Sequence, residues 1–191
     1  MTDPIAQFGE WFDAAREAGV RVPETMTLAT ASADGTPSAR MVLLKGADEH
    51  GFVFFTGYES RKGEELAANP RAALVFYWQP LGRQVRVEGP VERVPETESA
   101  EYWATRPRGS QLAAWTSRQS RPLASREELE QRYGELEREH EGREVPLPPH
   151  WGGFRLRPEA IEFWEHRDNR LHDRVRFTRA RDGWQAQRLW P

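Results

Sequence analysis

An Asp-Gly pair between two runs of strand-forming residues is the feature that most constrains the fold of this chain. The runs are Met26–Ser32 and Ser38–Lys45, and the pair between them is Asp34-Gly35. Asp-Gly favours the tight turn that joins antiparallel strands, because both residues tolerate positive φ angles. The sequence therefore predicts a β-hairpin in its first quarter.

Further strand-like runs follow, and helical segments interrupt them. The predicted strands are Gly51–Thr56, Ala72–Trp78, Gln84–Val94, Phe154–Leu156, Ile161–Glu165, Arg174–Thr178 and Trp184–Leu189. The predicted helices run from Pro4 to about Ala18, from Ser60 through Leu66, from Pro95 to about Thr105, and from a capping box at Ser125 and Glu128 to Gly142. Strands dominate both ends of the chain, so we expect an α+β, mainly β fold built on an antiparallel barrel or sheet.

The length of 191 residues suits one domain. Within it we expect an N-terminal helix in residues 1–20, a helical insertion at 95–142 and C-terminal strands at 150–191.

Composition excludes several classes of function. With 27 Lys and Arg against 30 Asp and Glu, the formal charge of −3 argues against a general nucleic-acid binder. The absence of cysteine excludes disulfides, iron–sulfur clusters and thiolate chemistry. No metal site is predicted, because no ligand spacing relates His50, His140, His150, His166 and His172. Neither a signal peptide nor a membrane-length apolar run is recognisable, so the cytoplasm is the expected compartment.

The segment RMVLLK, Arg40–Lys45, carries a cation at each end. On a regular strand these two side chains face opposite sides and lie roughly 16 Å apart. A long flat ligand meets both only if the strand twists or bulges. An ordinary strand with charged ends explains the pattern equally well.

Ser60, Arg61 and Lys62 stand where a helix is predicted to begin. Backbone N–H groups, the positive end of the helix dipole and two cations would converge there, as a phosphate site requires. Acids rather than cations are preferred in a first helical turn. The pattern therefore favours an anionic ligand over the alternative, a solvated helix start.

Two further segments carry cations. Tyr102 and Arg106 are four residues apart and share a face if the helix persists, and Ser110 follows in a predicted loop, so the three form a candidate second phosphate pocket. In RLHDR, an extended chain would project Arg170, His172 and Arg174 to one face. Such side chains repel one another unless an anion or an electron-rich ring lies against them. An edge strand that uses charge to block aggregation is the alternative.

Together these segments resemble the pyridoxamine 5′-phosphate oxidase family. The resemblance spans nearly the whole chain and rests on an ordered set of motifs: RMVLLK, FFTGYESRK, RQVRVEGPVE, RPRGSQ, SRQS, VPLPPHWGG, IEFW, RLHDR and the closing RLWP. It implies a split β-barrel with peripheral helices that forms a homodimer, with flavin mononucleotide (FMN) in clefts between the subunits.

The resemblance also implies residue roles. FMN would be held by Arg40, Met41, Val42, Leu43, Leu44, Lys45, Phe55, Thr56, Arg61, Lys62, Gln84, Gln119, Ser120, Trp164 and Arg174. The substrate would be held by Lys45, Tyr102, Arg106, Ser110, Arg170, Leu171 and His172, with Arg170 and His172 as the catalytic pair. The implied reaction oxidises pyridoxine or pyridoxamine 5′-phosphate to pyridoxal 5′-phosphate. Dioxygen is the electron acceptor and gives hydrogen peroxide, and the amine substrate also releases ammonia.

This sequence departs from the family pattern at three places. Val22 stands where several members carry an acid, and Glu165 replaces a more usual glutamine. The first helix is predicted at residue 4, so an N-terminal extension that covers the substrate in some relatives is expected to be missing. Two alternatives remain open: a same-fold oxidase of the phenazine-biosynthesis type, and a flavin- or pyridoxal phosphate-binding protein without turnover.

Overall fold

The predicted hairpin forms and begins the sheet. In the computed structural model, which describes residues 3–191, β1 (Thr25–Ala31) pairs antiparallel with β2 (Pro37–Leu43). Gly35 lies in the turn with φ of 86°, the left-handed region that an Asp-Gly turn requires. The hairpin prediction is therefore confirmed.

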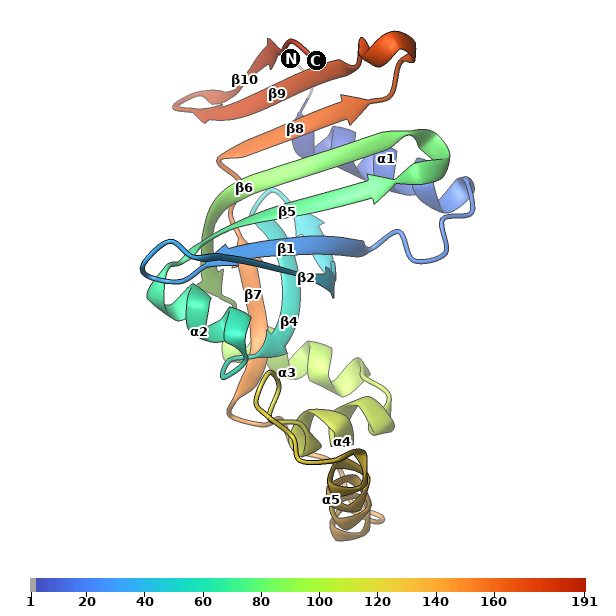
Figure 1. Cartoon of the computed structure of the whole chain (residues 1–191), viewed down its shortest axis with the longest axis vertical. Helices are drawn as coiled ribbons and strands as arrows, with labels where there is room; N and C mark the ends of the chain where they lie inside the picture. The colour runs from blue at the N-terminus through green and yellow to red at the C-terminus, as the bar shows by residue number, and fades with distance from the viewer. Residues whose placement is uncertain (1–2) are drawn as a thin grey trace.

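The remaining strands of the described part of the chain extend this hairpin into one strongly curled sheet of ten strands (Figure 1). Its main path runs β10-β9-β8-β6-β5-β1-β2, and β7, β4 and β3 branch from β6. The bounds are β3 Gly46–Asp48, β4 Gly51–Gly57, β5 Arg71–Trp78, β6 Arg83–Arg93, β7 Trp151–Leu156, β8 Ala160–Glu165, β9 Asp173–Ala180 and β10 Gly183–Arg188. The predicted mainly β architecture is confirmed, and only the three-residue β3 was not predicted.

Strand β6 changes its partner half-way along. Residues 83–88 pair with β8, whereas residues 91–93 pair with β7. Gly89 stands between the two halves, and a Cβ atom there would lie 1.9 Å from the carbonyl oxygen of Arg157. Only glycine allows this close approach, so the sheet divides at this residue.

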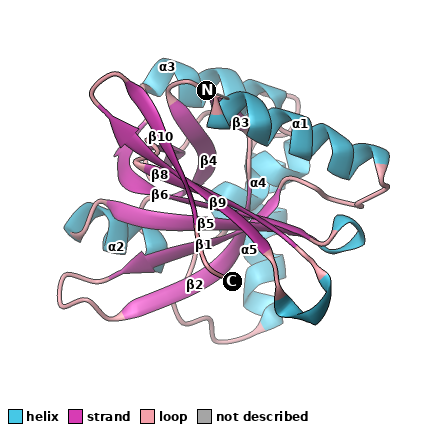
Figure 2. Ribbon diagram, turned by 90° about the horizontal axis from the view of Figure 1, so that it is seen from above, coloured by secondary structure: helices cyan, strands magenta, loops and turns pink. Residues whose placement is uncertain are grey.

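Within residues 3–191, five α-helices accompany the sheet: α1 (Pro4–Glu17), α2 (Arg61–Ala68), α3 (Glu96–Thr105), α4 (Arg108–Thr116) and α5 (Arg126–Glu139). Seen from above, α1 lies along one side of the stacked strands (Figure 2). Helices α3, α4 and α5 gather at the end of the molecule opposite to β8–β10 (Figure 1). None of these helices is long and apolar enough to cross a membrane.

Helix α4 corrects the prediction that Ser110 lies in a loop. Its first residues, Arg-Gly-Ser, favour turns over helix, which hid it in the sequence. Tertiary packing overrides this weak propensity, because Leu112 is buried in a cluster with Trp103 and Trp151.

One apolar core joins α1 to both halves of the chain. Phe8 packs against Phe52 and Phe76 with ring centroids 4.9 and 5.0 Å apart, and the same cluster includes Phe163 and Phe177 from β8 and β9. The expectation of a single domain over residues 1–191 stays a prediction, which this shared core supports.

Replacing Phe8 with alanine tests the contribution of α1. Phe8 is 2% exposed, so its loss leaves a cavity between the helix and the sheet. We expect the free energy of unfolding to fall by about 3–5 kcal/mol in urea titrations. The control is Glu10→Ala on the exposed side of the same helix, which should stay within about 0.5 kcal/mol of wild type. Equal effects of the two substitutions would show that α1 is not part of the core.

Candidate functional site

A cavity of about 770 Å³ brings together most of the predicted site residues. It lies among β2, β4, α2 and the start of α4. Its predicted lining residues are Arg40, Met41, Val42, Leu43, Lys45, Phe55, Thr56, Arg61, Lys62, Tyr102, Arg106, Ser110, Gln119 and Ser120. Leu44 does not line it and is buried in the core.

A bend after β2 explains how both ends of RMVLLK reach this cavity. The strand ends at Leu43. The Leu44 N–H then bonds to the carbonyl oxygen of Glu24, and the Lys45 N–H bonds to that of Val53 in β4. The chain thus changes its neighbour between these residues, so the strict alternation of a regular strand is broken. Because of this bend, Arg40 and Lys45 line the same cavity and can contact one ligand.

Lys62 is a buried cation at the first turn of α2. Its side chain is 6% exposed, and Nζ donates to Thr56 Oγ1, Ser60 Oγ and Gln119 Oε1 at 3.1, 3.3 and 3.2 Å. All three acceptors are neutral. Burial, reinforced by the positive charge of Arg40 and opposed by Glu65, lowers the pKa of Lys62 to about 8. An anion bound in the cavity would supply the negative counter-charge that these neutral acceptors do not provide.

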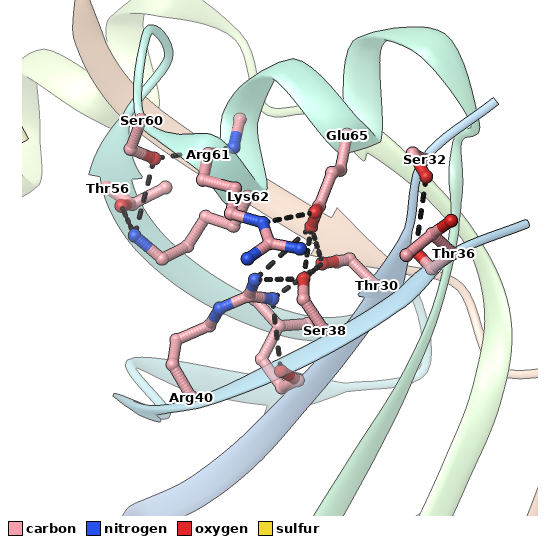
Figure 3. Close-up of polar contacts among 12 residues, drawn as sticks. Thr30, Ser32, Thr36, Ser38, Arg40, Thr56, Ser60, Arg61, Lys62 and Glu65 are labelled. Atoms are coloured by element: carbon pink, nitrogen blue, oxygen red, sulfur yellow. Dashed lines mark hydrogen bonds and ion pairs between the residues drawn. The ribbon is translucent and has the colours of Figure 1, made fainter. Parts of the chain in front are cut away.

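Glu65 organises the two arginines beside Lys62 (Figure 3). Its Oε2 lies 3.2 Å from Arg40 Nη2, and its Oε1 accepts from Arg61 Nε at 2.9 Å. Thr30 and Ser38 also donate to it. Burial alone raises the pKa of Glu65, but these four hydrogen bonds outweigh it and lower the pKa to about 2. Glu65 is therefore ionised and fixes both guanidinium groups.

Sequence reasoning missed Glu65, although a signal was present. Arg61 and Glu65 are four residues apart on a predicted helix, the spacing of an i,i+4 ion pair. Counting Arg40, Arg61, Lys62 and Glu65 together leaves two positive charges at the start of α2. This excess matches a phosphate dianion, and Ser60 caps the same helix by accepting from the Gly63 N–H.

A second cationic centre lies in the same cavity against an aromatic cluster. The guanidinium carbon of Arg106 is 4.5 Å from the ring centroid of Trp151, and Nη2 donates to the Ser110 carbonyl oxygen at 2.8 Å. Burial lowers the pKa of Arg106, opposed by Tyr102. Lys45 Nζ stands 5.8 Å from the ring centroid of Tyr102. Helix α3 ends at Thr105, so the cavity rather than one helix face unites Tyr102 and Arg106.

Other predicted residues lie elsewhere on the sheet. Gln84, Trp164 and Arg174 form one row across β6, β8 and β9, because Gln84 is paired with Trp164 and Trp164 with Arg174. Their sequence neighbours Val85 and Phe163 are buried, so the row faces away from the core. Five strand spacings separate β9 from β2, roughly 24 Å along the sheet. Within one chain, this row does not contribute to the cavity.

The segment RLHDR is not an extended strand, which corrects the prediction made for it. Residues 168–170 form a short 3₁₀ turn between β8 and β9, and β9 begins only at Asp173. The chain must reverse here because β8 and β9 are antiparallel neighbours. Arg170 has φ of 62° and Leu171 is 69% exposed. His172 packs its ring 4.5 Å from that of Trp164, which places it beside the Gln84–Trp164–Arg174 row.

Comparisons with known proteins show the family to which the chain belongs. The family model described as pyridoxamine 5′-phosphate oxidase matches residues 12–139. A second model, described as the pyridoxine 5′-phosphate oxidase C-terminal dimerisation region, matches residues 151–191. The chain belongs to the pyridoxamine 5′-phosphate oxidase family. Members of this family are FMN-dependent oxidoreductases, so the family, enzyme class and cofactor expected from the sequence are confirmed.

Individual relatives cover almost the whole chain. The pyridoxine/pyridoxamine 5′-phosphate oxidase of Rubrobacter xylanophilus is 63% identical over 99% of this chain and 87% of its own length. That of Salinibacter ruber is 55% identical over 99% of this chain and 89% of its own length. Among solved structures, PhzG from Burkholderia lata in complex with tetrahydrophenazine-1-carboxylic acid has a TM-score of 0.95, at 34% identity over 100% of this chain and 94% of that chain.

The residues at the start of α2 fit the phosphate of FMN. The cavity combines a helix N-terminus, a two-charge excess of cations and a buried ammonium group bonded only to neutral oxygens. Ser120, which lines the cavity, has φ of 72°, which is unusual for a residue other than glycine and is typical of ligand-binding loops.

Lys62→Met in FMN-free protein tests the electrostatic state of this site. The pKa of Lys62 is about 8 in the fold against 10.5 for an unperturbed lysine, so between these values the unfolded chain binds more protons. The stability of the wild type should therefore rise relative to Lys62→Met between about pH 8 and pH 10.5. Below about pH 8, Lys62 is protonated in both states, so the full cost of burying its charge remains and the stability difference should not change with pH. Urea titrations across this range measure the difference, and a pH-independent difference would contradict the assignment.

Proposed function

We propose that this protein is an FMN-dependent oxidase that converts pyridoxine 5′-phosphate and pyridoxamine 5′-phosphate to pyridoxal 5′-phosphate, with dioxygen as electron acceptor. One observation carries the proposal: a single cavity contains two separate cationic centres. The centre around Lys62 suits the phosphate of the cofactor. The centre around Lys45 and Arg106 suits the phosphate of a second ligand. A flavin enzyme acting on a phosphorylated substrate needs both.

We further propose that each active site is shared by two chains. Gln84, Trp164 and Arg174 face away from the core of their own chain, on the half of the sheet that lies away from β2. Met41 and Tyr77, 61% and 57% exposed, lie on the same face of the sheet. Exposed apolar side chains on a sheet face favour an interface between copies. In a two-fold dimer, the row of one subunit would complete the cavity of the other.

The residues of the chain would bind and orient the reactants, since bound FMN supplies the electron acceptor for the oxidation. Lys45, Tyr102, Arg106 and Ser110 would anchor the substrate phosphate. Arg170 would cover the pyridine ring and stabilise charge that develops on it, and His172 would reach its 3′-oxygen. The cytoplasmic location expected from the sequence stays a prediction.

The phenazine-type alternative draws support from the likeness to PhzG. A ligand such as tetrahydrophenazine-1-carboxylic acid carries no phosphate. The second cationic centre around Arg106 and the higher identity of the pyridoxine/pyridoxamine 5′-phosphate oxidases favour the phosphorylated vitamin. A binding protein without turnover would share the cavity but would not reduce its flavin.

Anaerobic reduction separates these three functions. The purified yellow protein is mixed with pyridoxine 5′-phosphate without oxygen, and we expect the flavin absorbance to bleach and pyridoxal 5′-phosphate to appear. Arg170→Leu should bind FMN but turn over at least about tenfold more slowly, because a charge-stabilising contact is lost. Near-normal turnover of this variant would refute the role of Arg170. A wild-type flavin that never bleaches would refute the proposed reaction.

Mixing two impaired variants tests the shared site. Arg106→Ala removes a cavity residue, and Arg170→Leu removes a residue of the β8–β9 turn. Co-expressed chains that assemble at random should recover about a quarter of wild-type activity, because half of the dimers contain one site with neither substitution. Co-expression of Arg106→Ala with Lys45→Ala is the control, since both substitutions lie in the cavity and no intact site can form. Equal activity of the two mixtures would exclude a site shared between chains.

A further inference from the structure

The turn that carries Arg170 and His172 is destabilised in two ways. Glu165 at the end of β8 and Asp173 at the start of β9 are directly paired across the two strands. Like charges in this position repel each other. The turn also places Asn169 and Arg170 in succession at φ of 56° and 62°, a conformation that asparagine tolerates but that is costly for arginine. Other contacts must therefore hold the turn in shape.

Arg167 supplies these contacts through its side chain. Its Nη2 donates to Glu165 Oε2 and its Nε donates to Asp173 Oδ2, each at 2.7 Å. One guanidinium group thus joins the carboxylates of both strands and cancels their repulsion. Arg83 on Glu165 and Arg188 on Asp173 complete the network. A bridge between two fixed acceptors holds geometry better than an isolated surface ion pair.

The backbone of the same residue reaches the candidate catalytic histidine. The N–H of Arg167 donates to Nδ1 of His172 at 3.2 Å. A ring nitrogen that accepts a hydrogen bond carries no proton, so the neutral imidazole has its proton on Nε2. Packing against Trp164 holds the plane of the ring. His172 is therefore prepared as a hydrogen-bond donor through Nε2.

We propose that Arg167 is a positioning residue: its guanidinium closes the β8–β9 turn, and its backbone N–H fixes the tautomer in which Nε2 of His172 donates to the 3′-oxygen of the substrate. The substrate in this statement rests on the proposed function, whereas the clamp and the tautomer are properties of the chain alone. Glu165, where the resemblance leads us to expect glutamine, has a role in this clamp. Its carboxylate accepts a hydrogen bond from the Arg167 guanidinium and so ties the β8–β9 turn to the end of β8.

The test compares Arg167→Ala with Arg167→Lys and with Arg181→Ala, an exposed arginine in the β9–β10 turn. The ¹⁵N NMR signals of the His172 ring are recorded in FMN-loaded, substrate-free protein and assigned by their loss in His172→Gln. KM and kcat are measured with pyridoxine 5′-phosphate. In Arg167→Ala we expect mixed tautomers and a KM about fivefold higher, as for one lost hydrogen bond, with a smaller change in kcat. Arg167→Lys should recover part of both effects, and Arg181→Ala should show neither.

A further variant separates repulsion from simple loss of structure. Adding Glu165→Gln to Arg167→Ala removes the like-charge pair, so the double variant should regain at least about half of the lost affinity. If Arg167→Ala does not fold, this double variant is compared with Glu165→Gln alone in its place. A lower melting temperature with unchanged ring signals and KM would overturn the proposal and leave Arg167 a merely structural residue. If the wild type does not oxidise the substrate, the proposed function fails, while the ring signals still decide the tautomer.

Discussion

The change of partner along β6 is the constraint on which the arrangement of the site depends. The first half of this strand pairs with β8, which continues the sheet to β10. Its second half pairs with β7, which in turn pairs with β4. Gly89 allows the division because a side chain there would collide with the backbone at Arg157. As a result, β4 comes to lie beside the end of β2 and builds the cavity, whereas Trp164 and Arg174 lie on β8 and β9, in the half of the sheet away from β2. A fold divided in this way separates the two groups of site residues within one chain.

The same geometry sets the electrostatics of the cavity. Lys62 and Arg106 are buried or half-buried cations whose hydrogen-bond acceptors are neutral oxygens. Burying a cation without a counter-charge costs free energy, and the lowered pKa values of both groups express this cost. Glu65 offsets only part of the charge near α2, and its four hydrogen-bond donors keep it ionised. The chain thus retains a positive excess that a bound phosphate neutralises.

Local sequence signals predicted the elements whose stability is local. Asp34-Gly35 identified the hairpin, and Ser60 and Ser125 identified helix starts at which both side chains accept the expected backbone hydrogen bonds. The sequence did not reveal α4, because its helical state depends on the burial of Leu112 against distant tryptophans. It also misled at RLHDR, where alternation predicted one extended face. The antiparallel pairing of β8 with β9 instead forces a turn there, and no local pattern shows that pairing.

The sequence proposed most members of the candidate site but not how the fold divides them. Motif order suggested the residues, yet it could not show that Gln84, Trp164 and Arg174 form one row facing away from the core, since that row exists only through the register of three strands. Because the cavity holds excess positive charge, an anionic cofactor that binds only the folded state stabilises that state. If the half-buried row of a second chain also covers the cofactor, folding, cofactor binding and dimer formation are linked equilibria. The free energy that one chain loses by leaving Lys62 and Arg106 without counter-charges is then recovered when the complete site assembles.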